Sequence, residues 1–194
     1  AKVTTPIVGA FGASAKAAVD WETAFTGVQK TVDATSEEYE QLANNIKQMS
    51  TETASSANEI AGVMEIAGQL GISGVDNLTN FTRTMVQLGD TTNLSAEEAA
   101  TALARFMNIT GESTSNVDKI GSAIVDLGNN FATSESEITE MATRLASAGT
   151  IAGMSSTDIL ALSAAMSSVG IQAEAGGTAM TQTLTAMTAA VANF

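Results

Sequence analysis

Apolar residues recur at spacings of three and four along most of this chain, which is the pattern of one face of an α-helix. One such stripe follows Ser134: Ile138, Met141, Ala142 and Leu145. Ser134 and Glu137 match a capping box, in which the serine hydroxyl accepts a hydrogen bond from a backbone amide and the glutamate reaches back. Gly149 can adopt the left-handed conformation that ends a helix. The pattern therefore predicts a helix from Ser134 to Gly149.

The same capping signal recurs along the chain. Four Ser-x-x-Glu or Ser-x-x-Asp motifs begin at Ser56, Ser95, Ser134 and Ser155. The first three serines are 39 residues apart. Gly71, Gly111 and Gly170 follow three of these motifs and predict the ends of their helices.

The residues between the caps also align at this interval. Leu78, Phe81, Met85, Val86, Leu88 and Gly89 align with Val117, Ile120, Ile124, Val125, Leu127 and Gly128, and Arg105 aligns with Arg144. Each unit is therefore predicted to hold a capped helix of about fourteen residues and a second helix that ends at Leu-Gly. Ser155 follows Ser134 by only 21 residues. This short interval predicts that the second helix of the unit, the one that ends at Leu-Gly, is missing between these two caps. That helix type is expected to return after Gly170, where Met180, Leu184 and Met187 match Phe81, Met85 and Leu88. Chance capping in a chain rich in serine and alanine is the alternative.

The first third of the chain has a looser helical pattern. Thr5-Pro6 is a suitable helix start, because proline in the first turn loses no helical hydrogen bond. A loose apolar stripe follows: Ile7, Phe11, Ala15, Ala18, Trp21 or Glu22, Phe25, Val28 and Val32. Thr35-x-x-Glu38 marks a second start, followed by Tyr39, Leu42, Ile46 and Met49. The polar stretch 50–56 is the best candidate for a boundary.

These patterns predict an all-α protein, with about eight to nine helices and no sheet, built as a multi-helix bundle or as an irregular array of short helix pairs. We expect residues 1–50 to form an N-terminal helical segment and residues 51–194 to form a helical-pair region with the 39-residue repeat. The uncharged stretch 175–194 contains no clear stop signal, so we expect this region to continue beyond the sequence given.

Composition narrows the possible functions. The 194 residues include 21 acidic and 8 basic ones, for a net charge of -13. Such a chain repels a phosphate backbone and is not expected to bind nucleic acid tightly. After Arg144 only Asp158 and Glu174 are charged. The absence of cysteine excludes disulfides and thiolate metal sites, and no signal peptide or ordinary membrane-spanning stretch is visible.

The residue types that carry chemistry are scarce. The chain has no histidine, so the usual general base near neutral pH and a Ser-His-Asp triad are absent. Two clusters of acidic residues lack the spacing of a Ca²⁺-binding loop, and we interpret them as acids at helix N-termini. The first cluster is Glu37, Glu38 and Glu40, and the second is Glu135, Glu137 and Glu140. The glycines at 68–74 and 175–179 are read as helix punctuation, because no phosphate-loop lysine follows. We expect no catalytic, cofactor-binding or metal site, no cofactor, and no enzymatic activity.

Several stretches resemble the central helical region of phage tail tape-measure proteins. They are TTPI (4–7), AAVDWETAFTGVQKTVDATSEEYEQL (17–42), SSANEIAGVMEIAGQLGI (55–72), the region 88–103, and SSTDILALSAAMSSVGIQAEAGGTAMTQTL (155–184). Their order and spacing extend over nearly the whole chain. Ser55 departs from the family pattern, in which an aromatic residue often precedes the cap.

The resemblance implies a structural protein of the virion that is made in the bacterial cytoplasm and lies inside the tail tube. Proteins of this family set tube length during assembly and leave before the genome does. The resemblance also implies tail-tube and tail-tip proteins, tail assembly chaperones and further copies of the chain as partners, with the host envelope as another contact.

Two other functions stay open at this point. Residues 145–194 carry few charges, which favours a membrane-active or translocating helical segment as one alternative. A helical signalling module is the other alternative, although sustained heptads are then expected and glycines interrupt the pattern every fifteen to twenty residues.

Overall fold

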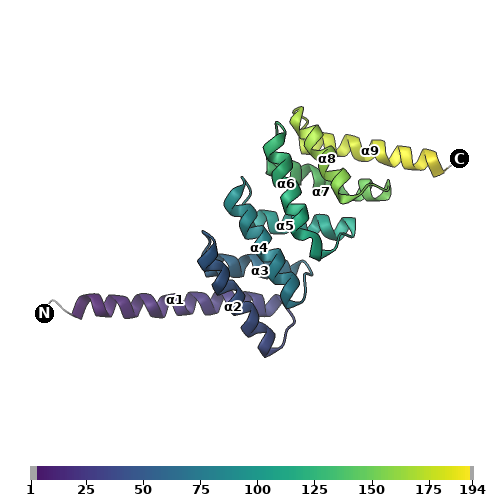
Figure 1. Cartoon of the computed structure of the whole chain (residues 1–194). Coiled ribbons are helices and arrows are strands. Elements are labelled where there is room, and N and C mark those ends of the chain that lie inside the picture. Colours follow the sequence, from purple (N-terminus) through teal and green to yellow (C-terminus); the bar gives the residue numbers. More distant parts are fainter. Residues whose placement is uncertain (1–3, 193–194) are drawn as a thin grey trace.

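A computed structural model describes the backbone of residues 4–192 and the side chains of residues 16–192. The described chain is all-α, as predicted, and its helices form an open, two-layered array whose termini lie at opposite ends (Figure 1). The helices are α1 (Thr4–Thr31), α2 (Ser36–Glu52), α3 (Ala57–Gln69), α4 (Val75–Thr91), α5 (Ala96–Thr110), α6 (Val117–Asn130), α7 (Glu135–Ile151), α8 (Ser156–Ser168) and α9 (Ala173–Ala192), with a 3₁₀ turn η1 (Thr114–Asn116).

Odd- and even-numbered helices occupy different layers. In one layer α3 packs on α1, α5 on α3, α7 on α5 and α9 on α7. In the other layer α4 packs on α2, α6 on α4 and α8 on α6. Consecutive helices such as α3 and α4, or α7 and α8, join the two layers. Each helix thus buries its apolar stripe against near neighbours in the sequence, as in repeat proteins that stack along one direction.

The predicted helix starts are confirmed. Complete capping boxes are present at Thr35, Ser56, Ser95, Ser134 and Ser155. At Ser95 the hydroxyl oxygen accepts from the Glu98 amide at 3.2 Å, and the Ser95 amide donates to the Glu98 carboxylate at 2.9 Å. Each box satisfies backbone donors that the first helical turn leaves without a partner.

The predicted apolar stripes form the core. Phe81, Ile120, Ile138 and Leu145 are all buried. Several positions related by the 39-residue interval bury alike, since Leu78 and Met85 of α4 correspond to Val117 and Ile124 of α6 and all four are buried. Val86 and Leu88 are buried as well, whereas their counterparts Val125 and Leu127 are partly buried. Helices α2, α3, α5 and α8 contribute further stripes to the same cluster.

Three predicted helix ends are wrong, because glycines inside helices serve close packing. Helix α7 continues through Gly149 to Ile151, and the left-handed glycine after it is Gly153. A Cβ atom on Gly149 would lie 2.8 Å from the Ile159 side chain of α8. The Leu-Gly steps also lie inside their helices: α4 continues past Gly89 to Thr91, and α6 continues past Gly128 to Asn130.

The prediction that a helix of the second type is missing before Ser155 is also wrong. Helix α8 packs on α6 and α7 and so takes the next position in the even layer. Helix α9 then packs on α7 in the odd layer, where it does not correspond to α4. Its side chains differ accordingly: Met187 is 60% exposed, whereas Leu88 of α4 is buried.

An aromatic cluster joins the N-terminal helices to the array. The rings of Trp21 and Phe25 stack with centroids 5.3 Å apart, and Lys47 of α2 lies over Trp21. The Tyr39 hydroxyl donates to the Val32 carbonyl at 2.6 Å. Val28 and Val32 are buried as predicted, whereas Ala18 is exposed and Ile7, Phe11 and Ala15 lie outside the described side chains.

Exchange of helix-interior glycines for alanine tests the close packing. A Cβ atom on Gly89 would lie 2.7 Å from the Ala96 backbone nitrogen, whereas one on Gly62 of α3 would meet only Glu97, at 3.9 Å. We expect Gly62→Ala to stabilise the fold by up to about 1 kcal/mol, since alanine favours helix over glycine. Gly89→Ala should lower the free energy of unfolding by about 1 to 2 kcal/mol, because the clash outweighs that gain. Denaturant titration measures both, and equal shifts would contradict this account.

Removal of one cap tests the predicted helix starts. Ser95→Ala should lower the free energy of unfolding by about 1 kcal/mol, because the α5 start loses its side-chain acceptor. Ser147→Ala, at an exposed position inside α7, is the matched control and should stay within about 0.5 kcal/mol of the parent. A Ser95→Ala protein as stable as this control would show that the cap contributes nothing to the array.

Candidate interaction surface

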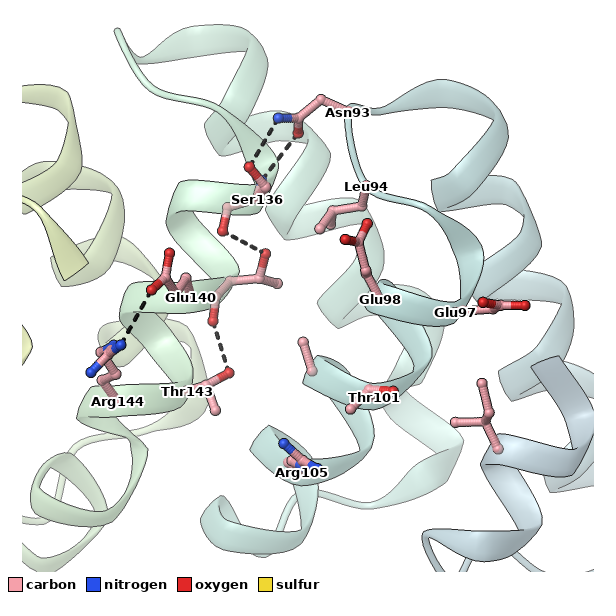
Figure 2. A pocket seen from close by; sticks show the side chains of 13 residues that line it. Asn93, Leu94, Glu97, Glu98, Thr101, Arg105, Ser136, Glu140, Thr143 and Arg144 are labelled. Carbon is pink, nitrogen blue, oxygen red and sulfur yellow. Dashed lines mark hydrogen bonds and ion pairs between the residues drawn. The ribbon is translucent and has the colours of Figure 1, made fainter. Parts of the chain in front are cut away.

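A groove lies on the odd layer of helices (Figure 2). It has a volume of about 820 Å³ and is open to solvent. Helices α5 and α7 form its walls, and the turn before α5 and one residue of α3 complete it. The lining residues are Ile66, Asn93, Leu94, Glu97, Glu98, Thr101, Ala102, Arg105, Ser136, Thr139, Glu140, Thr143 and Arg144.

A reciprocal pair of hydrogen bonds closes one end of the groove. The Asn93 side-chain amide donates to the Ser136 hydroxyl at 2.9 Å, and the Ser136 backbone amide donates to the Asn93 side-chain oxygen at 3.1 Å (Figure 2). These bonds tie the turn before α5 to the first turn of α7. Glu98 lies beside them and is held in the capping box of α5.

Two arginines at equivalent repeat positions lie toward the other end. Arg144 of α7 pairs with Glu140 at 3.4 Å, one helical turn away. Its aliphatic stem also covers Gly177 of α9, where a Cβ atom would lie 2.9 Å away. Arg105 of α5 is exposed and forms no ion pair with any described residue. The groove thus has both guanidinium groups toward one end, where Glu140 pairs with one of them, and Glu98 at the other end.

Two threonine hydroxyls in this groove, those of Thr139 and Thr143, donate to the helix backbone. Thr143 donates to the Thr139 carbonyl at 2.8 Å, and Thr139 donates to the carbonyls of Glu135 and Ser136. Nucleophilic catalysis requires a hydroxyl that is hydrogen-bonded to a base. Neither threonine hydroxyl has such a partner in this arrangement.

The carboxylates whose pKa values are shifted accept hydrogen bonds, most of them within the capping boxes at helix starts. Backbone and side-chain hydrogen bonds from Ser95 lower the pKa of Glu98, and those from Ser134 lower the pKa of Glu137. Hydrogen bonds from Ser56 and Ser155 lower the pKa values of Glu59 and Asp158 in the same way. A general acid needs the opposite shift, toward the working pH. These carboxylates therefore stay charged near neutral pH.

The structure shows where the acidic clusters and the glycine runs of the sequence lie. Glu37 and Glu38 lie in the first turn of α2, and Glu135 and Glu137 lie in that of α7. No group of three potential metal ligands forms within residues 4–192. Gly71 and Gly74 have positive φ in the turn after α3, so these two punctuate helices as predicted. Gly68 does not, because it lies inside α3, where a Cβ atom would lie 2.8 Å from the Thr31 and Val32 side chains.

The prediction of punctuation is wrong for the second glycine run. Gly176 and Gly177 are buried inside α9, near its start, where they face Met141, Met166 and Arg144.

The groove was not predicted from the sequence. One signal was available, since Arg105 and Arg144 align across the repeat. Residues at the same position of adjacent units are expected to lie side by side in a stacked array.

None of the described helices combines the length and the apolar character needed to cross a bilayer. This includes α9, whose 20 residues carry many threonines.

The comparisons with known proteins give one match. A family model described as phage-related minor tail protein matches residues 43–193, from within α2 through α9. No curated protein matches the chain, and no solved structure does. The match covers most of the chain and all of the groove. The chain therefore belongs to the phage-related minor tail protein family, and its role is that of a structural component of the phage tail.

Proposed function

We propose that this chain is the helical part of a tape-measure protein, which lies in the lumen of the tail tube, sets tube length during assembly and leaves before the genome. Its partners would be tail-tube and tail-tip proteins and the tail assembly chaperones. The family match supports a tail protein, and the tape-measure role is our extension of it. The same proposal divides the chain into an N-terminal helical segment, 1–50, and a region of helix pairs, 51–194.

The observation that carries this proposal is growth of the fold along one direction. A helix contacts its near neighbours in the sequence and the two termini lie at opposite ends (Figure 1). In such a fold a unit can be added or removed without rebuilding a common core. A protein that measures length needs this property, because its extent must change in proportion to its sequence.

The charge of the chain supports a position along the path of the DNA. With a net charge of -13, the protein would repel a passing polyanion. Acidic side chains occur in the first helical turns along the array, among them Glu59, Asp76, Glu97, Asp118 and Glu135. A chain with such a surface that leaves ahead of the genome would not bind the DNA that follows it.

Deletion of one repeat unit tests the measuring role. In the phage or prophage that encodes the chain, in-frame removal of residues 95–133 should shorten the tail. The loss should be at most about 60 Å, which is the length of the unit as one continuous helix at about 1.5 Å per residue. Replacement of the same residues by an unrelated helical sequence of equal length is the control and should restore the length. Electron microscopy of tails gives the measurement, and unchanged tails in the deletion would refute the proposal.

Titration with duplex DNA tests the proposed repulsion. Fluorescence anisotropy of a labelled duplex should detect no complex at physiological salt, with any dissociation constant weaker than about 10⁻⁴ M, because the chain offers few cations to replace counterions. Lowering the salt should not produce a complex either, since unscreened repulsion grows. A micromolar complex that weakens as salt rises would contradict the proposal.

A further inference from the structure

One arginine of the groove lacks the partner that its counterpart in the next unit has. Arg105 of α5 and Arg144 of α7 occupy equivalent repeat positions. Glu140 lies one helical turn before Arg144, and its carboxylate pairs with the guanidinium at 3.4 Å. The equivalent position before Arg105 is Thr101. Arg105 is exposed and forms no ion pair with any described residue (Figure 2).

An unpaired guanidinium stands out in this chain because carboxylates are abundant, with 21 acidic and 8 basic residues. Arginine binds a carboxylate through two parallel hydrogen bonds, which gives the contact a defined geometry. Arg105 can form such a contact with another molecule without breaking any ion pair within the described part of the chain. The pair of Glu140 and Arg144 indicates where the incoming carboxylate lies, over the helical turn that precedes the arginine.

The other end of the groove carries the opposite charge. Glu97 lies in the first turn of α5, is exposed, and has no ion-pair partner among the described residues. It precedes Arg105 by eight residues, which is about 12 Å along a helix. Glu98 and Glu140 line the groove as well, so a purely acidic ligand would be repelled. The groove therefore fits a ligand that is positive toward Glu97 and negative toward Arg105.

The lining also includes apolar side chains. Leu94 is buried, and Ile66 and Ala102 are partly buried against the core. The groove is open along the surface and has a volume of about 820 Å³, which suits an extended segment better than an enclosed small molecule. The odd layer already packs against helices of the even layer, α4 on α5 and α8 on α7. A helix that covers the groove would pack on α5 and α7 in the same manner.

From these observations we propose that the groove between α5 and α7 binds a helix of a partner protein. An acidic side chain of this helix pairs with Arg105, a basic one pairs with Glu97, and apolar side chains between them cover Ile66 and Ala102. Charges about seven residues apart lie on one face of a helix and about 10 Å apart along it, close to the separation on α5. The inference goes beyond the proposed measuring role and does not depend on it.

A double-mutant cycle with designed peptides tests the contact. The probe is a labelled helical peptide with glutamate and lysine about seven residues apart and with alanine and leucine between them. A second peptide carries glutamine in place of the glutamate. Fluorescence anisotropy with the whole chain should show at least about threefold tighter binding of the glutamate peptide, because only this peptide gives Arg105 a carboxylate. In Arg105→Gln this preference should vanish.

Thr101→Glu tests the same contact without removal of the arginine. It recreates in α5 the arrangement of Glu140 and Arg144, so an internal carboxylate should occupy Arg105 and abolish the preference. Lys119→Gln, at an exposed position of α6 outside the groove, is the matched control. It removes the same charge as Arg105→Gln and should keep the preference. Circular dichroism should be unchanged in all three variants, because none of these side chains belongs to the buried core.

Three outcomes would overturn the proposal. A parent that binds neither peptide has no such site, and a preference that survives in Arg105→Gln does not come from this arginine. A parent that binds neither peptide but dimerises in sedimentation velocity, and loses the dimer in Arg105→Gln, would assign the groove to a second copy of the chain instead.

Discussion

Burial of each helix's apolar stripe against neighbouring helices is the interaction on which the rest of this structure depends. Helices α3 to α8 have 13 to 17 residues, and isolated helices of this length are marginal in water. Ion pairs add little, since the described residues form two, Arg83–Glu52 and Arg144–Glu140, both exposed to solvent. The array therefore holds together through apolar contacts between consecutive units.

The sequence predicted the starts of these helices well, because a capping box is a local signal between a residue and the third one after it. It predicted the ends less well, because glycine serves two purposes. Gly71, Gly111 and Gly170 adopt positive φ and lie where helices end. Gly89, Gly149 and Gly177 lie inside helices and admit a neighbouring chain. Which role a glycine takes depends on the partner that packs against it, and the local sequence does not contain that partner.

The position of α8 illustrates a second limit of the same kind. Its cap at Ser155 resembles those of α3, α5 and α7, which suggested a helix of the same type with one helix skipped before it. A cap determines where a helix starts but not which layer it joins. Ile159, Leu160 and Ala164 are buried, and α8 packs on α6 and α7, so packing decided its place. The groove between α5 and α7 was not predicted for a similar reason, since it requires side chains from adjacent units.

The carboxylates of the capping boxes have two effects: they stabilise the helix starts and they give the surface negative charge. Glu38, Glu59, Glu98, Glu137 and Asp158 each receive hydrogen bonds from the residue that begins their helix, and these bonds lower their pKa values. The groups that begin the helices therefore also keep the protein negatively charged, so repeating the unit repeats both helix start and charge. Beyond Glu174 this coupling ends, because α9 continues without any acidic residue.

The two ends of the array therefore differ physically. Units at the ends of a stacked array lack one neighbour and are its least stable part unless something else covers them. At the N-terminal end the Trp21 and Phe25 rings, with Lys47 and Tyr39 of α2, supply additional contacts. At the other end of the described residues Gly176 and Gly177 let α9 approach α7 closely, so there the close packing of backbones takes the place of aromatic contacts.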